Sequence, residues 1–336
     1  MSASTTGSMP RTLAHVLHSN LCITLPIPEA VPGLSEQTII VTGSNIGLGY
    51  ESSLHLLRLG VGKLIMAVRD VKKGEAAREE LLRATNCKPE TIEVWKVDMS
   101  NYASVQDLAA RASQLPRLDV VLANAGMATR TFDVAEGSEQ TLTINVIATF
   151  LLFLLVLPKL REAPSTGRFV IPNSALHYVA PISELAPAVK GEKGSIYNAL
   201  NDKKAALMGQ RYPLSKLLVV YMIRELTEQM RASGKPGVIL NTPNPSACKS
   251  QLMREYSWIE LKLGNSFART AEMGSRALVN GVLGGQETHG QYLDDCKVVE
   301  PATTVTSEQG VAIQKAFYRE TMEKLEAICP GVTGNI

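Results

Sequence analysis

The sequence predicts a single α/β domain, in which helices cover both faces of a doubly wound parallel sheet. From residue 37 onward, short β-branched or apolar runs alternate with segments of helical periodicity. The interval between successive runs is long enough for the crossover helix that parallel strands require. A glycine-rich turn also joins the first run to the first helical segment. Together these observations indicate repeated βαβ units.

The chain divides into an arm, a domain and a tail. Residues 1–36 contain four prolines and no periodic apolar pattern, so we expect an arm that lies on the domain or is partly mobile. Residues 37–327 form the expected domain, and residues 328–336 form a short tail. Within the domain, the irregular stretch at about 243–268 is expected to close over a substrate.

The expected elements follow in order along the domain. Each strand is a short apolar run, and each helix has apolar residues at helical spacing or many helix-forming residues. Gly43 ends the first strand, and Gly60 ends the first helix. The expected strands cover residues 38–41, 63–68, 92–97, 119–123, 168–171 and 237–241. The expected helices cover residues 47–59, 71–84, 105–114, 139–161, 215–232, 271–282 and 308–327.

Composition excludes several classes of protein. Apolar residues make up 45% of the chain, and the net charge of +2 comes from interspersed basic and acidic residues, unlike a nucleic-acid-binding surface. The five scattered cysteines lack CxxC spacing, so we expect neither a disulfide framework nor a metal site. The longest apolar run, 150–157, is shorter than the roughly 20 residues that span a bilayer. Because no signal-peptide pattern is present, we expect a cytoplasmic protein without an integral membrane segment.

A candidate cofactor site follows the first strand, in the stretch Thr42-Gly43-Ser44-Asn45-Ile46-Gly47-Leu48-Gly49. Glycines let the backbone turn sharply and approach a pyrophosphate, which then lies at the positive end of the following helix. The candidate pyrophosphate-binding residues are Gly43, Ser44, Asn45, Ile46, Gly47 and Gly49. The alternative is an ordinary glycine turn, but its place between a strand and a helix favours a Rossmann-type dinucleotide site.

The end of the second strand distinguishes between the two nicotinamide dinucleotides. NAD-binding folds usually place an acid there for the ribose hydroxyls, whereas NADP needs a cation for its additional phosphate. The strand ends with Val68-Arg69, and Arg69 is well placed to clamp a phosphate, so we expect NADPH rather than NADH. Two alternatives remain: Arg69 only solvates the strand end, or Asp70 is the ribose acid after a register shift of one residue.

Two further motifs accompany the glycine turn: Asn124-Ala125-Gly126 after the fourth strand, and Tyr212-xxx-Lys216. Together the three motifs resemble the fingerprints of the short-chain dehydrogenase/reductase superfamily. The resemblance covers about residues 37–327. The closer likeness is to retinol-dehydrogenase-like and fungal members, and it is carried by the arm and by residues 66–70, 269–274 and 290–292.

The resemblance implies a catalytic tetrad of Asn145, Ser174, Tyr212 and Lys216. Reduction of a carbonyl needs a hydride for its carbon and a proton for its oxygen. Tyrosine can supply that proton only when its pKa, about 10 when unperturbed, is lowered. A lysine four residues later lies one helical turn away, favours the phenolate and can also hold the nicotinamide ribose. The alternative is a half-buried tyrosine above a solvated lysine.

The other tetrad members have structural alternatives too. Ser174 follows a strand, where its hydroxyl can donate to the substrate oxygen or instead bond its own turn. Asn145 lies within a helix, where asparagine is unfavourable, so its side chain is expected to hold a water that relays protons to Lys216. A simple helix–strand hydrogen bond is the alternative.

Other residues are expected on the adenosine side of the cofactor. Asp98 follows the third strand and is expected to face the adenine ring. Asn124, Ala125 and Gly126 follow the fourth strand and are expected to support the adenosine.

The chain departs from the family pattern after the sixth strand. Where the family carries Pro-Gly and a later threonine over the nicotinamide, this chain has Pro245-Ser246 and Ser250. The Ser250 hydroxyl can bond the cofactor phosphates, but Ser246 is unfavourable if its backbone needs a positive φ. Pro172 is also unusual near the end of a central strand, because proline cannot donate to the ladder.

The long interval between Ser174 and Tyr212, which includes residues 190–194, is interpreted as an insertion at the mouth of the substrate pocket. Its candidate lining residues are His177, Tyr178 and Tyr197. The candidate lining residues of the closing stretch are Met253, Tyr256, Trp258 and Ile259. Their apolar and aromatic character fits a hydrophobic substrate, and equally fits core or dimer contacts.

The expected function is NADPH-dependent reduction of a ketone or aldehyde on a hydrophobic small molecule, in natural-product or lipid metabolism. One alternative is oxidation of a secondary alcohol with NADP. Another is a non-redox cofactor-binding protein that guides a cyclisation or isomerisation. The family commonly pairs through helices matching residues 145–160 and the Tyr212 helix, so a homodimer or homotetramer is compatible with the sequence, and the arm could extend or block that contact.

Overall fold

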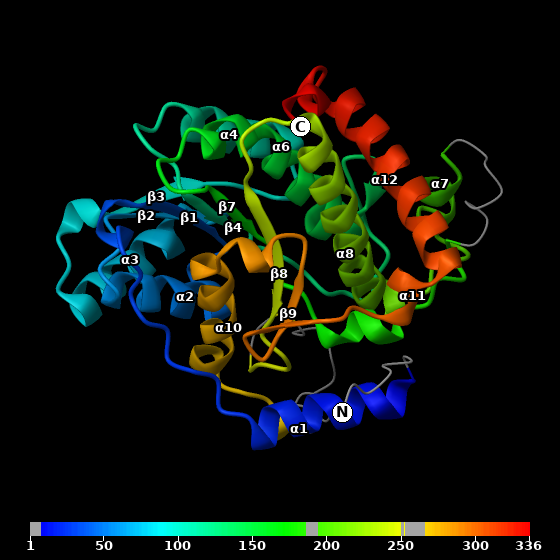
Figure 1. The fold of residues 1–336 in the computed structure, drawn as a ribbon, viewed down its shortest axis with the longest axis horizontal. Helices are drawn as coiled ribbons and strands as arrows, with labels where there is room; N and C mark the ends of the chain where they lie inside the picture. Colours follow the sequence, from blue (N-terminus) through cyan, green and yellow to red (C-terminus); the bar gives the residue numbers. More distant parts are fainter. Residues whose placement is uncertain (1–7, 186–193, 250–251, 253–265) are drawn as a thin grey trace.

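The computed structural model describes residues 8–185, 194–249, 252 and 266–336. Its main sheet has eight strands in the order β10-β9-β8-β7-β4-β1-β2-β3 (Figure 1). These strands are β1 (Thr38–Thr42), β2 (Lys63–Val68), β3 (Ile92–Lys96), β4 (Val120–Leu122), β7 (Arg168–Val170), β8 (Ile239–Asn244), β9 (Tyr292–Asp294) and β10 (Lys297–Val299). Every neighbouring pair is parallel except β9 and β10, which form an antiparallel hairpin at one edge.

Helices cover both faces of the sheet, which confirms the doubly wound α/β prediction. One face carries α2 (Gly47–Arg58), α3 (Val71–Thr85) and α10 (Ala271–Leu283). The other carries α4 (Tyr102–Ser113), α6 (Ala148–Arg161), α8 (Met208–Ser233) and α12 (Glu308–Ile328). Each layer buries its own apolar cluster against the sheet, so the strands are buried on both sides, as parallel strands normally are.

The remaining elements are short, apart from the 14-residue helix α1. The helical ones are α1 (Met9–Cys22), α5 (Gln140–Leu142), α7 (Ser195–Leu200), α11 (Thr303–Thr306), a π-helix at Thr143–Ile147 and 3-10 turns at Leu34–Glu36, Pro89–Thr91, Ala175–Val179, Gln286–Thr288 and Val332–Asn335. A small hairpin joins β5 (Val134–Ala135) to β6 (Ser138–Glu139).

Three elements differ from the sequence-based expectation. The arm contains the helix α1, which begins with proline at its first turn, a position where the missing N–H costs nothing. The helix that carries the tyrosine motif begins at Met208, earlier than expected, so Tyr212 lies inside it. The expected helix 139–161 contains a π-helical turn, a feature that apolar periodicity does not reveal.

The apolar stretch Gln140–Arg161 is the one described segment long and apolar enough to cross a membrane by length and composition. In the fold, 83% of its most apolar window is buried. It contacts α4 and the 3-10 turn Val332–Asn335, so it serves here as the central helix of one layer.

Candidate active site

The glycine turn lies between β1 and α2 and has the shape that the motif predicts. Gly43 and Gly47 have φ of +65° and +58°, the left-handed region that favours glycine. A Cβ on Gly49 would lie against the Gly43 carbonyl oxygen and 2.5 Å from Asn124 Nδ2. The backbone can therefore approach a ligand closely here, at the start of α2.

Ser44 is fully buried within this turn. Its hydroxyl has no hydrogen-bond partner among the residues that the structure describes. A buried hydroxyl without a partner costs free energy, and a ligand phosphate at the turn would satisfy it. The turn therefore fits a dinucleotide, and its exposed Ile46 would border the ligand.

Asn124 joins the end of β4 to the glycine turn. Its Nδ2 donates to the carbonyl oxygens of Thr42 at 3.0 Å and Gly43 at 3.2 Å. The next amide, Ala125 N, donates to Thr42 Oγ1 at 2.9 Å. Asn124 thus fixes the shape of the turn, whereas the sequence suggested direct support of the adenosine.

The residues after β2 bear on the choice between the two dinucleotides. Asp70 is the N-cap of α3, and its carboxylate accepts a hydrogen bond from Lys73 N at 3.2 Å. Arg69 is the residue directly after β2 and is exposed. The register is the one expected, and Asp70 has a capping role. After β3, the Asp98 carboxylate accepts hydrogen bonds from Ser100 N at 2.9 Å and Ser100 Oγ at 2.7 Å.

Tyr212 and Lys216 lie one turn apart on α8, as the spacing predicts. Lys216 Nζ lies 5.5 Å from the centre of the Tyr212 ring and donates to the carbonyl oxygen of Pro172 at 2.7 Å. Lys216 is only 8% exposed, and this burial lowers its pKa to about 8. The amine therefore still carries a charge at neutral pH, beside the tyrosine.

Ser174 begins the 3-10 turn Ala175–Val179, which packs against α8. Its Oγ accepts a hydrogen bond from Leu176 N at 3.2 Å, as the turn alternative predicts. Because the oxygen accepts this bond, the hydroxyl proton remains for donation to a second group. The two alternatives are thus compatible in this geometry.

Asn145 lies in the π-helix, and its side chain bonds protein groups. Nδ2 donates to Met127 O at 2.9 Å and to Ser215 Oγ at 3.0 Å. Oδ1 accepts from Met127 N at 2.9 Å. Both amide protons bond protein groups, so the side chain fixes the loop after β4 to α8, and the expected water-holding role stays a prediction. Asn145 Oδ1 also lies 3.3 Å from where a Cβ on Gly126 would be.

Asn173 is a site residue that the sequence reasoning missed. Its Oδ1 accepts from Ser174 N at 2.7 Å, and its Nδ2 donates to Lys216 O at 3.3 Å and Thr242 Oγ1 at 3.0 Å. Asn173 is 2% exposed. Its buried side-chain amide therefore connects Ser174, Lys216 and Thr242 of β8. A polar residue directly after a strand and next to Ser174 was the available signal.

Arg211, the residue before Tyr212, was also missed. It is fully buried, with Nε 3.6 Å from Glu139 Oε2 and Nη2 3.2 Å from Glu184 Oε2. Nη2 also donates to Leu200 O at 3.0 Å. Buried ion pairs fix local geometry strongly, because breaking one leaves a buried charge without a partner. Arg211 thus anchors the first turns of the catalytic helix.

The three residues expected to line the insertion are buried, and their role as lining residues stays a prediction. His177 is fully buried, with Nδ1 2.8 Å from Ser174 O and Nε2 accepting from Ala302 N, and burial lowers its pKa to about 4. The hydroxyls of Tyr178 and Tyr197 bond Glu300 O and Thr321 Oγ1 inside the fold. They pack the core beside the site, because their polar tips all find internal partners.

The loop after β8 has a left-handed residue where the family carries glycine. Ser246 has a φ of +61°, so the backbone adopts the positive φ that is unfavourable for serine. This conformation costs conformational free energy in a residue with a side chain. Its N donates to Asn244 Oδ1 at 2.9 Å. Pro172 lies beyond β7, which ends at Val170, so it removes no ladder donor. Ser250, Met253, Tyr256, Trp258 and Ile259, with residues 186–193 of the insertion, lie outside the described residues.

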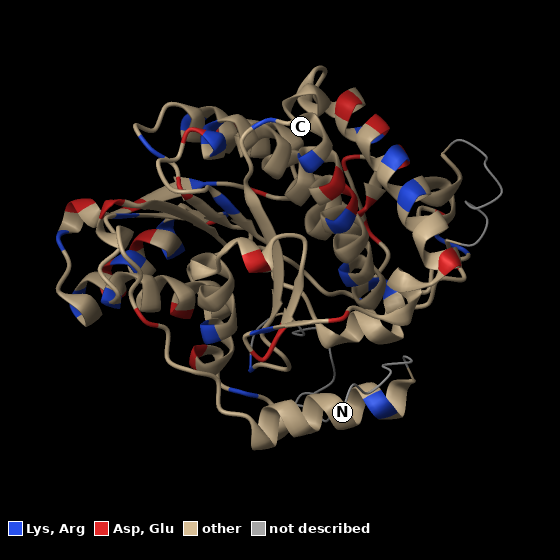
Figure 2. Cartoon of the chain, in the orientation of Figure 1, with Lys and Arg blue, Asp and Glu red and all other residues tan. Residues whose placement is uncertain are grey.

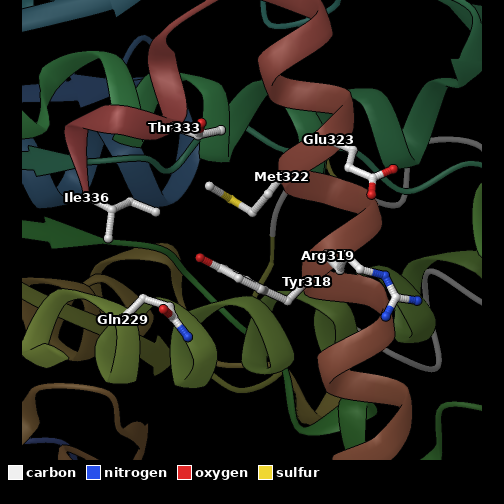
Figure 3. Close-up of a pocket in the computed structure, with 7 residues that line it drawn as sticks. All are labelled: Gln229, Tyr318, Arg319, Met322, Glu323, Thr333 and Ile336. Carbon is white, nitrogen blue, oxygen red and sulfur yellow. The ribbon is translucent and has the colours of Figure 1, made fainter. Parts of the chain in front are cut away.

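Two further expectations concern surfaces. Basic and acidic residues are interspersed over helices and loops (Figure 2). The helices expected to pair between subunits also contact other parts of this chain: α8 contacts α12, and α6 contacts α4 and the turn Val332–Asn335. Their pairing between subunits stays a prediction. An open hollow of about 410 Å³ lies between α8 and α12, where Tyr318, Met322 and Ile336 converge (Figure 3). None of the candidate site residues lines it.

Comparison with known proteins decides the family. The short chain dehydrogenase family model matches residues 37–183. Short chain dehydrogenase/reductase dmxR8 of Cryptosporiopsis sp. is 42% identical and covers 95% of this chain and 99% of its own length. The chain belongs to the short-chain dehydrogenase/reductase family. As a member, it is an oxidoreductase with a nicotinamide cofactor.

Other known proteins are similar over most of the chain. Short chain dehydrogenase atnD of Emericella nidulans is 40% identical over 81% of this chain and 87% of its own. An uncharacterized protein from Mycobacterium paratuberculosis shares the fold with a TM-score of 0.65 at 22% identity, covering 88% and 96% of the two chains. A short-chain dehydrogenase from Sphingobium yanoikuyae in complex with NADPH gives a TM-score of 0.55 at 18% identity, covering 89% and 96%.

Proposed function

We propose that this enzyme reduces a ketone or aldehyde of a hydrophobic small molecule, with NADPH as cofactor. The observation that carries the proposal is the placement of Lys216, buried and 5.5 Å from the Tyr212 ring on the same helix. The cofactor, when bound, supplies a hydride to the carbonyl carbon. Tyr212 gives its phenolic proton to the carbonyl oxygen, and the Lys216 charge stabilises the negative oxygen that remains.

Ser174 and Asn173 orient the substrate in this proposal. The Ser174 hydroxyl, whose oxygen already accepts from Leu176 N, donates its proton to the substrate oxygen. Asn173 keeps Ser174 and Lys216 in register through its hydrogen bonds to both. Asn145 holds the neighbouring turn of α8 through Ser215. Substrate and proton donor are thereby held in one geometry before reaction.

The preference for NADPH rests on the residues after β2. An exposed Arg69 there can bond the additional phosphate of NADPH, whereas Asp70 caps α3. The pyrophosphate would be held by the glycine turn, through Gly43, Ser44, Asn45, Ile46, Gly47 and Gly49. The adenosine would be bordered by Asp98, Asn124, Ala125 and Gly126. Ser250, in the loop after β8, would bond the phosphates. The NADPH in the Sphingobium yanoikuyae protein, which has the same fold, is consistent with this choice.

The substrate class and cellular setting are inferred from sequence. The apolar and aromatic side chains between residues 253 and 259 favour a hydrophobic substrate, and resemblance to fungal members favours natural-product or lipid metabolism. All five cysteines are free, which fits a reducing cytoplasm.

The test is NADPH oxidation, followed by absorbance, with a panel of hydrophobic ketones and aldehydes. We expect turnover with NADPH and much less with NADH. Tyr212→Phe removes only the proton donor, so turnover should fall about 10²- to 10⁴-fold while NADPH still binds. Turnover that survives in Tyr212→Phe would contradict the proposed role of Tyr212, whereas binding of NADPH without turnover of any carbonyl would favour a non-redox function.

A further inference from the structure

The N-terminal helix α1 packs against the protein with its polar side. Its two buried residues are Thr12 and Ser19, whereas Leu13 and Leu21 are 56% and 61% exposed. Val16 packs partly against the core, and directional polar contacts supply the other contacts that hold the helix. These contacts converge on one feature, the loop after β8.

The first contact reaches Ser246 through three hydrogen bonds in series. His15 Nε2 lies 2.6 Å from Asp294 Oδ2 at the end of β9. Asn244 Nδ2 donates to Asp294 Oδ1 at 2.9 Å, and Asn244 Oδ1 accepts from Ser246 N at 2.9 Å. Asp294 and Asn244 are 3% and 1% exposed, so solvent competes little with the bond between them, whereas the His15 side chain is 42% exposed.

The second contact holds the loop just beyond Ser246. Asn20 Nδ2 donates to Ala247 O at 3.0 Å and to Phe267 O at 2.9 Å. Ala247 O also accepts from Arg269 N at 2.8 Å, and Arg269 O accepts from Lys249 N at 2.9 Å. One amide on α1 therefore joins the two chain segments that approach each other here.

Arg269 fixes the end of α1 that carries Asn20. Its Nη2 donates to Ser19 O, Ile23 O and Asp295 Oδ1 at 2.7, 3.2 and 2.8 Å. Ser19 O also accepts from Ile23 N, and a cation at the last carbonyls of a helix is favoured by the helix dipole. Because Arg269 is 5% exposed, this end of α1 is held rigidly against the β9–β10 turn.

Ser246 needs such support. Its φ of +61° is unfavourable for a residue with a side chain, and the family has glycine at this position. We propose that α1 is a positioning element for the nicotinamide-covering loop: His15 and Asn20 hold residues 244–249 in the conformation that closes on the cofactor. The inference rests on the proposed function, because it assumes that this loop covers the nicotinamide of NADPH.

The experiment compares two ligands in His15→Leu/Asn20→Leu, which removes both contacts without adding charge. The ligands are NADPH and the adenosine bisphosphate half of NADP, which lacks nicotinamide. We expect the Kd for NADPH to rise about tenfold, since each lost hydrogen bond costs a few-fold. The Kd for the half-ligand should stay within about twofold, because the glycine turn and Arg69 are untouched.

Two control variants sharpen the result. His18→Leu changes an exposed histidine of the same helix and should leave both affinities unchanged. His15→Gln keeps an N–H that can donate to Asp294 and should recover most of the NADPH affinity in an otherwise native chain, compared with His15→Leu.

The outcomes separate this inference from the proposed function. If wild type binds NADPH and the double variant binds it equally well, the inference is wrong and the proposed function stands. If both ligands weaken equally, α1 only stabilises the fold and the inference is again wrong. If wild type binds neither ligand, the proposed function itself fails.

Discussion

The two halves of the candidate site are stabilised in different ways. In the half formed by β1, β2 and β4, contacts join neighbouring parts of the sheet edge, as when Asn124 bonds the carbonyls of Thr42 and Gly43. In the half formed by β7 and β8, contacts come from helices outside the sheet. Lys216 of α8 bonds Pro172 O, and α1 reaches Ser246 through Asp294.

This difference explains why the sequence motif is intact in one half and altered in the other. The glycine turn depends on its own φ angles and close contacts, so a side chain there has nowhere to go. The loop after β8 carries Ser246 in place of the family's glycine and still has the left-handed conformation. Its support comes from residues elsewhere, which a local motif does not include.

The largest expected effect comes from Gly49→Ala. The added Cβ would meet the Gly43 carbonyl and Asn124 Nδ2, so the turn must distort. We expect NADPH affinity to fall by about 100-fold or more, with a loss of about 2 kcal/mol in the free energy of unfolding, measured by ligand titration and urea denaturation. Gly209→Ala is the matched control, because a Cβ there meets nothing within 4 Å. Native-like binding by Gly49→Ala would refute the local account of the turn.

Lys216→Met tests the burial of charge in the other half. Burial lowers the pKa of Lys216 from 10.5 to about 8, so the unfolded chain keeps the proton to higher pH than the folded one. Without cofactor, wild-type stability relative to the variant should therefore rise by about 3 kcal/mol from pH 8 to pH 10.5.

Urea denaturation across this pH range measures the difference for Lys216→Met. Lys203→Met, at an exposed position, should run parallel to wild type. A constant difference between wild type and Lys216→Met would mean that the amine is solvated in the folded protein.

Arg69→Ala should change cofactor preference. Loss of the phosphate-binding cation is expected to weaken NADPH by about 10-fold or more and to leave NADH almost unchanged. The ratio of kcat/KM for the two cofactors reports this directly. Arg83→Ala, at an exposed position in the last turn of α3, is the control and should keep the wild-type ratio. An unchanged ratio in Arg69→Ala would indicate that Arg69 only solvates the end of the strand.

Ser246→Gly should have the smallest effect and the opposite sign. Glycine adopts φ of +61° without steric cost, so the free energy of unfolding should increase by roughly 1 kcal/mol. Thermal denaturation would show this as a rise in Tm of a few degrees. A decrease in Tm would show that the Ser246 side chain stabilises the loop more than its backbone conformation costs.

The sequence predicted the locally encoded part of the molecule well. The alternating apolar runs gave the strands at the sheet centre, and residue spacing placed Tyr212 and Lys216 on one helix. Contacts between residues far apart in the sequence could not be predicted from it. His15 bonds Asp294 across 279 positions, and Arg211 meets glutamates 72 and 27 positions earlier, and no local pattern encodes such pairings. The same holds for His177, whose aromatic character suggested a pocket but whose nitrogens bond Ser174 and Ala302.

The most direct test of the central claim is a titration of the wild-type enzyme with NADPH and NADH, followed by cofactor fluorescence. The account predicts saturable binding of NADPH, at least about tenfold tighter than that of NADH, because the glycine turn binds the pyrophosphate and Arg69 binds the additional phosphate. Binding of neither nucleotide would contradict the account at its base. Tighter binding of NADH would leave the redox assignment standing and overturn the role given to Arg69.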